Sequence, residues 1–214
     1  MATQPDSPVG VFDQAAALLW DFDGVLLDSM PVRNDAFRHV LKDFHATDVE
    51  TLVEWHVKNG GLSRYVKFRR FQTEIIGMAL DESLVQQWAG EFSDYCKSRL
   101  VDPDLLIASS NHLLPALAAR LPMHVVSGSD GNELRGLCDA LGLTSYFISV
   151  EGSPTPKTVL VAEIMRRHAY APERTWLIGD STNDFEAAHA NGLQFMGFGN
   201  PEVKMCSGHF WGIE

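Results

Sequence analysis

Two aspartates stand at the end of an apolar run and are followed at once by a glycine. Asp21, Asp23 and Gly24 come directly after the apolar residues 15–20. The run does not alternate between apolar and polar residues, which is typical of a central parallel strand that is covered on both faces. In an extended chain residues i and i+2 point to the same side, so the two carboxylates would repel each other unless a cation or a proton intervened. The pattern suggests a magnesium site built on a nucleophilic aspartate.

Polar side chains that could complete such a site follow the later apolar segments. Ser127 and Gly128 come after one run, and Lys157 begins a helical stretch after another. A further run is followed by a group of acidic and amide residues, namely Asp180, Asn183 and Asp184. Ligands of open parallel sheets bind beyond the carboxyl ends of the strands. We therefore expect these side chains to meet at one rim of a sheet.

The segments that must hold these residues alternate between strand and helix patterns. Together with residues 15–20, the apolar runs predict strands over 123–126, 146–150, 175–179 and 193–198. The apolar residues between them recur at helical spacing and predict helices over 111–120, 131–141, 158–168 and 185–191. Strands that alternate with helical crossovers indicate an open parallel α/β sheet. The expected fold class is therefore α/β, a Rossmann-like core with three layers.

A helical block separates the first strand from the rest of the sheet. From Met30 to about Leu100 no segment has a strand pattern, and Ser63, and for a later helix Asp81 or Ser83, are candidate N-caps within the block. We expect residues 30–102 to form an inserted α-helical cap. The α/β core is expected over 15–29 and 103–214, and residues 1–14 are expected to form a loose N-terminal tail.

The composition limits the classes of partner and compartment. The formal net charge of −11 disfavours nucleic acid and anionic membranes as partners. No apolar run approaches the ~20 residues of a membrane span, and the first residues lack the pattern of a signal peptide. Three scattered cysteines fit reduced thiols in a cytoplasmic protein. The expected oligomeric state is a monomer or homodimer.

Four motifs, in this order, resemble those of the haloacid dehalogenase superfamily of aspartyl phosphohydrolases. They are Asp21-Phe22-Asp23-Gly24-Val25, Ser127, Lys157, and the stretch from Gly179 to Asp184. The helical insertion after the first motif resembles subclass I of that superfamily, the branch of phosphoglycolate phosphatase and β-phosphoglucomutase with an α-helical cap. The resemblance implies a hydrolase that acts on phosphoric monoesters, with Mg²⁺ as its cofactor and a small phosphorylated metabolite as its expected partner.

The resemblance also implies a role for each residue. Asp21 would be the nucleophile that forms an aspartyl-phosphate, and Asp23 the general acid and then the general base. Ser127 and Gly128 would donate hydrogen bonds to the phosphoryl oxygens, and Lys157 would stabilise their charge. The implied metal-binding residues are Asp21, Asp23 through its backbone carbonyl, Asp180 and Asp184, and Asp184 could instead orient a ligand water or Lys157.

Three residues outside the catalytic roles are candidates for contacts with the substrate. Arg64 and Lys67 in the cap, and Asn183 in the core, are the expected substrate-binding residues. For the two cap residues a solvated helix face is an equally weighted interpretation, because Arg69 and Arg70 continue the basic run.

Two departures from the family pattern stand out. The lysine follows Gly-Ser-Pro-Thr-Pro instead of preceding a proline, although Lys157 is the only lysine between residues 98 and 203. The stretch after Phe198 is short, so we expect a further strand and helix that many relatives carry to be missing.

Two other functions share part of the pattern. A phosphomutase of the β-phosphoglucomutase type has the same motifs, but mutase-like members tend to have an acid where this chain has Gly179. A phospho-receiver or sugar-phosphate-binding regulatory protein also combines acids, a hydroxyl and a lysine. Receivers, however, lack a helical insertion after the first strand.

Overall fold

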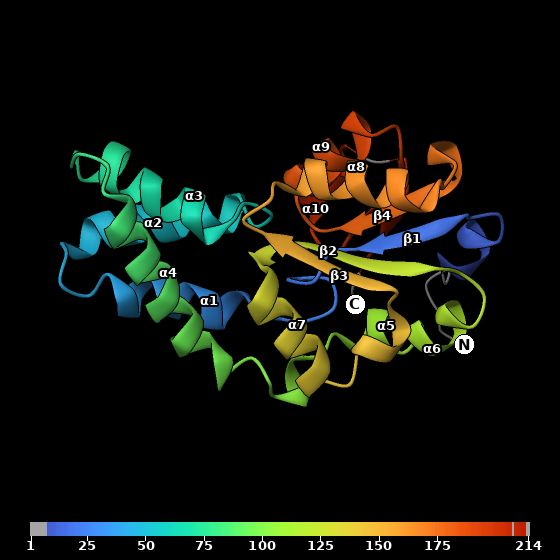
Figure 1. Ribbon diagram of the computed structural model, residues 1–214, viewed down its shortest axis with the longest axis horizontal. Coiled ribbons are helices and arrows are strands. Elements are labelled where there is room, and N and C mark those ends of the chain that lie inside the picture. Colours follow the sequence, from blue (N-terminus) through green and yellow to red (C-terminus); the bar gives the residue numbers. More distant parts are fainter. Residues whose placement is uncertain (1–7, 207, 213–214) are drawn as a thin grey trace.

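One parallel sheet of six strands forms the centre of the computed structural model, which describes residues 8–206 and 208–212 (Figure 1). The strand order is β3-β2-β1-β4-β5-β6. The strands are β1 Ala17–Trp20, β2 Met123–Asp130, β3 Ser149–Ser153, β4 Thr175–Gly179, β5 Gln194–Phe198 and β6 Phe210–Trp211. The order reverses between β1 and β4, which is where a doubly wound sheet opens a crevice for ligands. The predicted α/β fold class is confirmed.

Helices cover both faces of the sheet because β1 is apolar on both sides. Ala17 and Leu19 belong to the core under α8 and α9, whereas Leu18 and Trp20 belong to the core on the opposite face. Figure 1 shows α8 and α9 above the sheet and α5, α6 and α7 below it. These helices are α5 Ala108–Asn111, α6 Leu114–Ala118, α7 Gly131–Ala140, α8 Lys157–His168 and α9 Thr182–Ala190.

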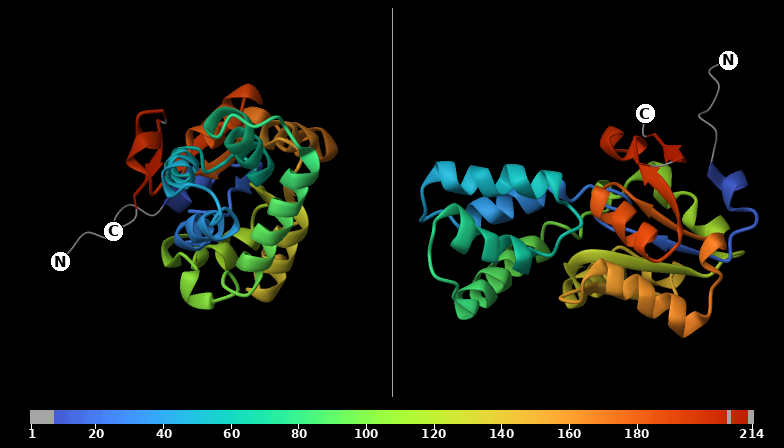
Figure 2. Two further views of the ribbon diagram at one scale, coloured as in Figure 1. Left: turned by 90° about the vertical axis from the view of Figure 1, so that its left-hand side faces the viewer. Right: turned by 90° about the horizontal axis from the view of Figure 1, so that it is seen from above.

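The first helices after β1, from α1 to α4, form a bundle at one end of the sheet (Figure 2). An aromatic cluster fills its centre, where the Phe37 and Phe92 rings lie 4.6 Å apart and Phe68 packs beside them. Ser63 and Asp81 are N-caps, as predicted. The bundle consists of α1 Met30–Val40, α2 Ala46–Lys58, α3 Arg64–Arg70, a π-helical turn Phe71–Ile75 and α4 Glu82–Lys97. The boundary of the cap at residues 30–102 stays a prediction.

Two other expectations from the composition can be compared with the structure. The three cysteines Cys96, Cys138 and Cys206 are free thiols. None of the helices in the described part of the chain combines the length and the apolar character that a membrane span requires.

Two predicted elements of the core are wrong in their bounds. The segment expected as one helix over 111–120 contains the last residue of α5 and the whole of α6. Pro115 lies in the first turn of α6 and has no backbone N–H to continue α5. The strand expected over 146–150 is shifted to Ser149–Ser153. Tyr146 ends a 3₁₀ turn, and the polar residues Glu151 and Ser153 pair with the long strand β2 instead.

The carboxyl-terminal part of the sheet is more complete than predicted. A short helix α10, Pro201–Lys204, leads into β6, which pairs in parallel with β5 through Gly197 and Phe210. The expectation that this strand and helix are missing is wrong. Trp211 is buried and packs edge-on against Phe198 at a centroid distance of 4.9 Å, so a two-residue strand is held by its aromatic side chains.

Part of the predicted tail belongs to the core. Residues 1–7 lie outside the described residues, but Pro8–Phe12 form a 3₁₀ turn. The side chain of Phe12 is fully buried and meets Trp176 at a ring-centroid distance of 5.5 Å. The loose tail therefore does not extend to residue 14.

Replacement of Phe12 tests this correction. Phe12→Ala leaves a cavity beside Trp176, and we expect it to lower the free energy of unfolding by about 3 kcal/mol. Val11→Ala changes a neighbouring side chain that is 39% exposed, and it should change that free energy by less than about 0.5 kcal/mol. Urea unfolding of both variants measures the difference. Equal stabilities would show that the segment does not contribute to the core.

Candidate active site

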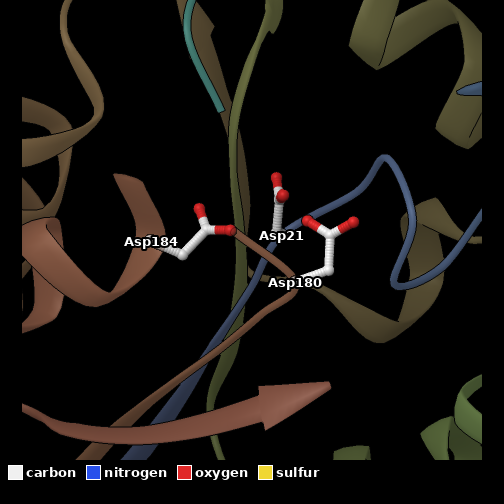
Figure 3. Close-up of side chains that lie close together, drawn as sticks. All are labelled: Asp21, Asp180 and Asp184. Atoms are coloured by element: carbon white, nitrogen blue, oxygen red, sulfur yellow. The ribbon is translucent and has the colours of Figure 1, made fainter. Parts of the chain in front are cut away.

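Three aspartates converge at the rim of the sheet where the strand order reverses. Asp21 follows β1, Asp180 follows the neighbouring strand β4, and Asp184 lies in the first turn of α9. One carboxylate oxygen from each residue lies within 4.8 Å of the others. Figure 3 shows the three side chains pointing toward one another. The structure thus brings together three of the residues expected to bind a metal.

Lys157, the first residue of α8, inserts its ammonium group between two of these acids. Its Nζ lies 2.8 Å from Asp21 Oδ1 and also forms an ion pair with Asp184. The other oxygen of Asp184 accepts hydrogen bonds from the backbone N–H and the hydroxyl of Ser181, which closes a capping box on α9. Asp184 therefore caps a helix and also fixes the lysine.

The acids are not fully neutralised by this single ammonium group. Burial and the neighbouring Asp184 carboxylate raise the pKa of Asp21 to about 7, although Lys157 opposes the shift. Burial, Asp21 and Asp184 raise the pKa of Asp180 well above its usual value. Burial lowers the pKa of Lys157, but the two acids outweigh it and keep the lysine charged. The cluster has an excess of negative charge that a bound cation would offset.

The backbone beside the cluster leaves room for the acids. Gly24 has a φ of +77°, and a Cβ atom there would lie 2.1 Å from Asp180 Oδ2. Only glycine combines this conformation with so close an approach. The glycine after Asp23 is thus explained by the position of Asp180.

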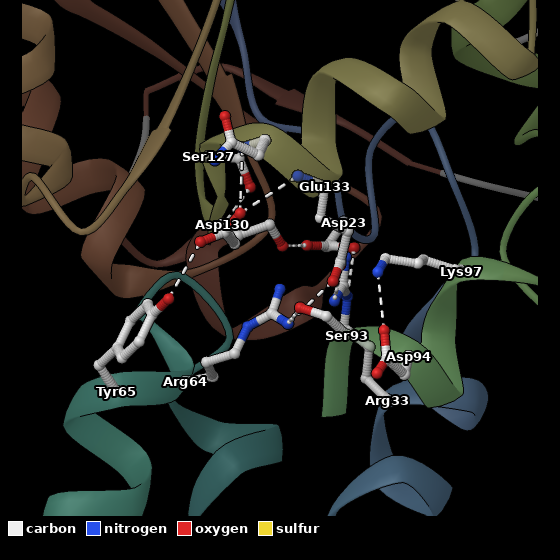
Figure 4. A network of polar contacts seen from close by, with 12 residues as sticks. Asp23, Arg33, Arg64, Tyr65, Ser93, Asp94, Lys97, Ser127, Asp130 and Glu133 are labelled. Atoms are coloured by element: carbon white, nitrogen blue, oxygen red, sulfur yellow. Dashed lines mark hydrogen bonds and ion pairs between the residues drawn. The ribbon is translucent and has the colours of Figure 1, made fainter. Parts of the chain in front are cut away.

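Asp23 does not join the three acids and is held by three donors. Arg33 Nε donates to its Oδ1 at 2.7 Å, and the hydroxyls of Ser29 and Ser129 donate as well (Figure 4). Burial raises the pKa of Asp23, but Arg33 and the hydroxyl donors outweigh it and hold that pKa below its usual value. In this arrangement Asp23 is ionised.

Ser127 and Gly128 lie within β2, which is longer than predicted. Ser127 is buried, and its hydroxyl oxygen accepts a hydrogen bond from the Ser129 N–H at 3.1 Å. A Cβ atom on Gly128 would lie 2.2 Å from the carbonyl oxygen of Gly61. The loop before α3 therefore rests directly on the strand end that carries the two residues.

The two basic cap residues are buried, so the interpretation as a solvated helix face is wrong for both. Arg64 forms an ion pair with Glu133 at 2.8 Å and donates to Ser93 Oγ at 2.6 Å. Lys67 Nζ lies 2.7 Å from His56 Nδ1 and 3.2 Å from the Gly60 carbonyl oxygen. Both side chains face the strand ends of the sheet.

Asn183 borders a cavity next to the loop that precedes α3. The cavity has a volume of about 190 Å³, and Gly61, Gly128 and Lys157 also line it. The amide nitrogen of Asn183 is buried and has no hydrogen-bond partner. It is thus free to bind a ligand that reaches Lys157.

Four residues around Asp23 are not predicted from the sequence. Ser29, Arg33, Ser129 and Glu133 form the network that holds it and links it to Arg64. The spacing of Asp130 and Glu133 is that of a capping box, and Asp130 does cap α7. That local signal does not reveal that Glu133 points toward two arginines, because those contacts join segments 69 and 100 residues apart.

The chain is similar to a known family and to several known proteins. The sequence profile described as "Haloacid dehalogenase-like hydrolase" matches residues 18–198. The chain is 27% identical over 188 residues to a phosphoglycolate phosphatase from Colwellia psychrerythraea, a match that covers 84% of this chain and 82% of that protein. It is 26% identical to the fructose-1-phosphate phosphatase YqaB from Escherichia coli, with 86% and 96% covered.

A solved structure has the same fold. A protein described as a predicted phosphatase from Clostridium acetobutylicum superposes with a TM-score of 0.76 over 94% of this chain and 95% of that one, at 18% identity. The likeness extends to the helical bundle between β1 and β2, because nearly the whole chain is covered.

Proposed function

The chain belongs to the haloacid dehalogenase-like hydrolase family, and on this premise we propose that it is a Mg²⁺-dependent phosphatase of a small phosphorylated metabolite. The single observation that carries the proposal is the buried ion pair of Asp21 and Lys157 at 2.8 Å, with Asp180 beside it. A carboxylate held at a strand end next to a fixed ammonium group is suited to attack a phosphoryl group. The relatives named above include two phosphatases of small phosphate esters, which supports the same class.

In the first step a carboxylate oxygen of Asp21 attacks phosphorus and the ester bond to the leaving oxygen breaks. The product is an aspartyl-phosphate on Asp21. Lys157 stabilises the charge on the phosphoryl oxygens, and the Ser127 hydroxyl and Gly128 N–H donate hydrogen bonds to them. Asp184 keeps Lys157 in place through their ion pair.

Asp23 carries the proton in both steps. Its protonated form gives the proton to the leaving oxygen, and its ionised form then takes a proton from the water that attacks the aspartyl-phosphate. The proton taken in the second step is the one given in the next turnover. Arg33, Ser29 and Ser129 favour the ionised form, which is the form that hydrolysis of the intermediate needs.

The acidic cluster fits a magnesium ion. Mg²⁺ prefers hard oxygen ligands, and one carboxylate oxygen each of Asp21, Asp180 and Asp184 lies within 4.8 Å of the others. Burial and, after it, the neighbouring carboxylates raise the pKa values of Asp21 and Asp180. Asp21, Asp180 and the backbone carbonyl of Asp23 would hold the ion, while the oxygens of Asp184 are already used by Lys157 and Ser181. When bound, the ion would offset the repulsion between the nucleophile and an anionic phosphate.

We further propose that residues 30–102 act as a cap that closes over the site. The support is the contact of the Gly61 carbonyl with Gly128, which places a cap loop on the phosphate-binding strand end. Closure excludes bulk water and strengthens the electrostatic interactions inside.

One observation disfavours the mutase alternative. A Cβ atom on Gly179 would lie 2.4 Å from the Cβ of Asp184. An acid at this position, as in mutase-like members, would displace the residue that fixes Lys157. The helical bundle α1–α4, inserted after β1, likewise does not fit a phospho-receiver.

A metabolite screen tests the function. We expect the purified protein with Mg²⁺ to release phosphate from an aryl phosphate and, more efficiently, from one or more small phosphate esters, with 2-phosphoglycolate and fructose 1-phosphate included. Treatment with EDTA should lower the rate at least ~100-fold, and added Mg²⁺ should restore it. Phosphate release that continues at the full rate in EDTA would contradict the proposal.

Gly128→Ala tests the contact between the cap loop and the strand end. The methyl group cannot share space with the Gly61 carbonyl, so the loop must move away, and we expect kcat/KM for the aryl phosphate to fall about 10²-fold. Gly136→Ala is the matched control, because a Cβ there meets no atom within 4 Å. Equal activities of the two variants would show that the contact does not matter for turnover.

A further inference from the structure

A small cavity beside Asp23 is the place where a leaving group would sit, given the proposed function. It has a volume of about 20 Å³ and is lined by Asp23, Arg33, His56, Arg64, Lys67 and Ser129 among others. This is room for about one water molecule, so a leaving group enters only when the cap moves. The cavity lies next to the carboxyl group that protonates the leaving oxygen. The charged side chains that line the cavity therefore affect which phosphate esters the enzyme hydrolyses.

Two carboxylates neutralise the two arginines of this cavity. Arg33 pairs with Asp23 at 2.7 Å and with Glu133 Oε1 at 3.1 Å, and Arg64 pairs with Glu133 Oε2 at 2.8 Å (Figure 4). The side chains of Arg33, Arg64 and Glu133 are each at most 5% exposed. Salt and water screen such buried charges weakly, so Glu133 cancels positive charge that a ligand would otherwise use.

Lys67 is the basic residue of this cavity for which the described residues provide no carboxylate ion pair. Its described polar partners are His56 Nδ1 and the Gly60 carbonyl, and neither is a carboxylate. Burial lowers the pKa of Lys67 to about 7, and burial also keeps His56 neutral by lowering its pKa. An anionic group bound here would favour the charged form of Lys67.

Hydrogen-bond donors in the same place also lack partners. Arg33 Nη2 and Arg64 Nη2 are buried and have no hydrogen-bond partner. Buried polar groups in proteins are nearly always satisfied, so donors left over in a cavity indicate a ligand. These donors can bind the oxygens of hydroxyl or carboxylate groups while the guanidinium charges stay balanced by Glu133 and Asp23.

We propose that Glu133 is a specificity-determining residue that restricts the enzyme to phosphate esters whose leaving group carries at most one negative charge. This rests on the proposed function. Once Asp23 has given its proton to the leaving oxygen it is ionised, and Asp23 and Glu133 then balance Arg33 and Arg64. In that state one negative charge on the leaving group pairs with Lys67 and leaves the cavity neutral. A second phosphate group carries close to two negative charges and leaves one of them unpaired near Glu133. An unpaired charge in a buried site is energetically unfavourable.

A pair of substrates that differ only in the second phosphate tests the proposal. We expect the wild-type protein to prefer fructose 1-phosphate over fructose 1,6-bisphosphate by at least tenfold in kcat/KM. Glu133→Gln keeps the shape and removes the charge, and it should reduce this preference at least fivefold. Glu163→Gln, an exposed carboxylate on α8, should leave the preference unchanged. A structural role alone would lower both rates and leave their ratio as it is.

A second variant keeps the test independent of whether Glu133→Gln folds. Lys67→Met should lower the ratio of kcat/KM for 2-phosphoglycolate to that for fructose 1-phosphate at least tenfold, because only the first leaving group carries a negative charge. The proposal is overturned if the wild-type protein hydrolyses the bisphosphate as well as fructose 1-phosphate, or if both variants keep the wild-type ratios. Hydrolysis of an aryl phosphate by the wild-type protein with Mg²⁺ distinguishes this failure from failure of the phosphatase function, which would overturn both.

Discussion

Asp21→Asn is expected to abolish phosphate release from an aryl phosphate, with a loss of at least ~10⁴-fold in kcat. The amide has the shape of the carboxylate but neither its charge nor its nucleophilicity, so no aspartyl-phosphate forms. Lys157 would still occupy its position next to Asp184. Phosphate release at saturating substrate and Mg²⁺ measures the effect.

The same variant should be at least as stable as the wild-type protein. Asp21 is buried among like charges, which raise its pKa to about 7 together with its burial, so its charged form is disfavoured by the fold. A neutral side chain removes that repulsion and should not lower the free energy of unfolding. A catalytic residue often lowers the stability of the fold in this way. Asp43→Asn, at an exposed position of the cap, is the control for the substitution itself. Full activity of Asp21→Asn would exclude Asp21 as the nucleophile, and a lower Tm in EDTA would contradict the electrostatic account.

The residues at the strand ends were predictable because their signals are local. An apolar run ends in Asp21 and Asp23, and another ends before Asp180, so the rule that ligands lie at the carboxyl ends of parallel strands brings them together. Lys157 could be identified because no other lysine lies between residues 98 and 203. The structure places Lys157 between Asp21 and Asp184, which the sequence alone did not specify.

The residues that surround Asp23 were not predictable by the same reasoning. Arg33 and Glu133 each lie on a helix, where charged residues are usually solvated, and their contact joins segments 100 residues apart. They are buried only in the folded chain, where Glu133 on α7 pairs with Arg33 on α1 and with Arg64 on α3. The same lack of local signal explains the missed strand β6, whose two residues are too few to form a pattern and are held by Trp211.

Lys157→Met is expected to lower the free energy of unfolding in EDTA by about 3–5 kcal/mol and to remove most of the activity. The methionine fills the volume of the lysine stem but leaves Asp21 and Asp184 as buried carboxylates without the ammonium group that balances their charge. Loss of the charge that stabilises the phosphoryl oxygens should reduce kcat at least ~10²-fold. Urea unfolding in EDTA and steady-state phosphate release measure the two effects.

Mg²⁺ separates the two roles of the lysine. A ligand that binds only the folded state stabilises it by mass action, and in the variant the ion would meet three acids whose charge Lys157 no longer offsets. We therefore expect Mg²⁺ to raise the Tm of Lys157→Met more than that of the wild-type protein, while the activity stays low. Lys42→Met, at an exposed position, should behave like the wild-type protein in both assays. If Mg²⁺ stabilised the two proteins equally, Lys157 would not be the charge that balances the cluster, and the assignment of the ion to Asp21 and Asp180 would lose its electrostatic basis.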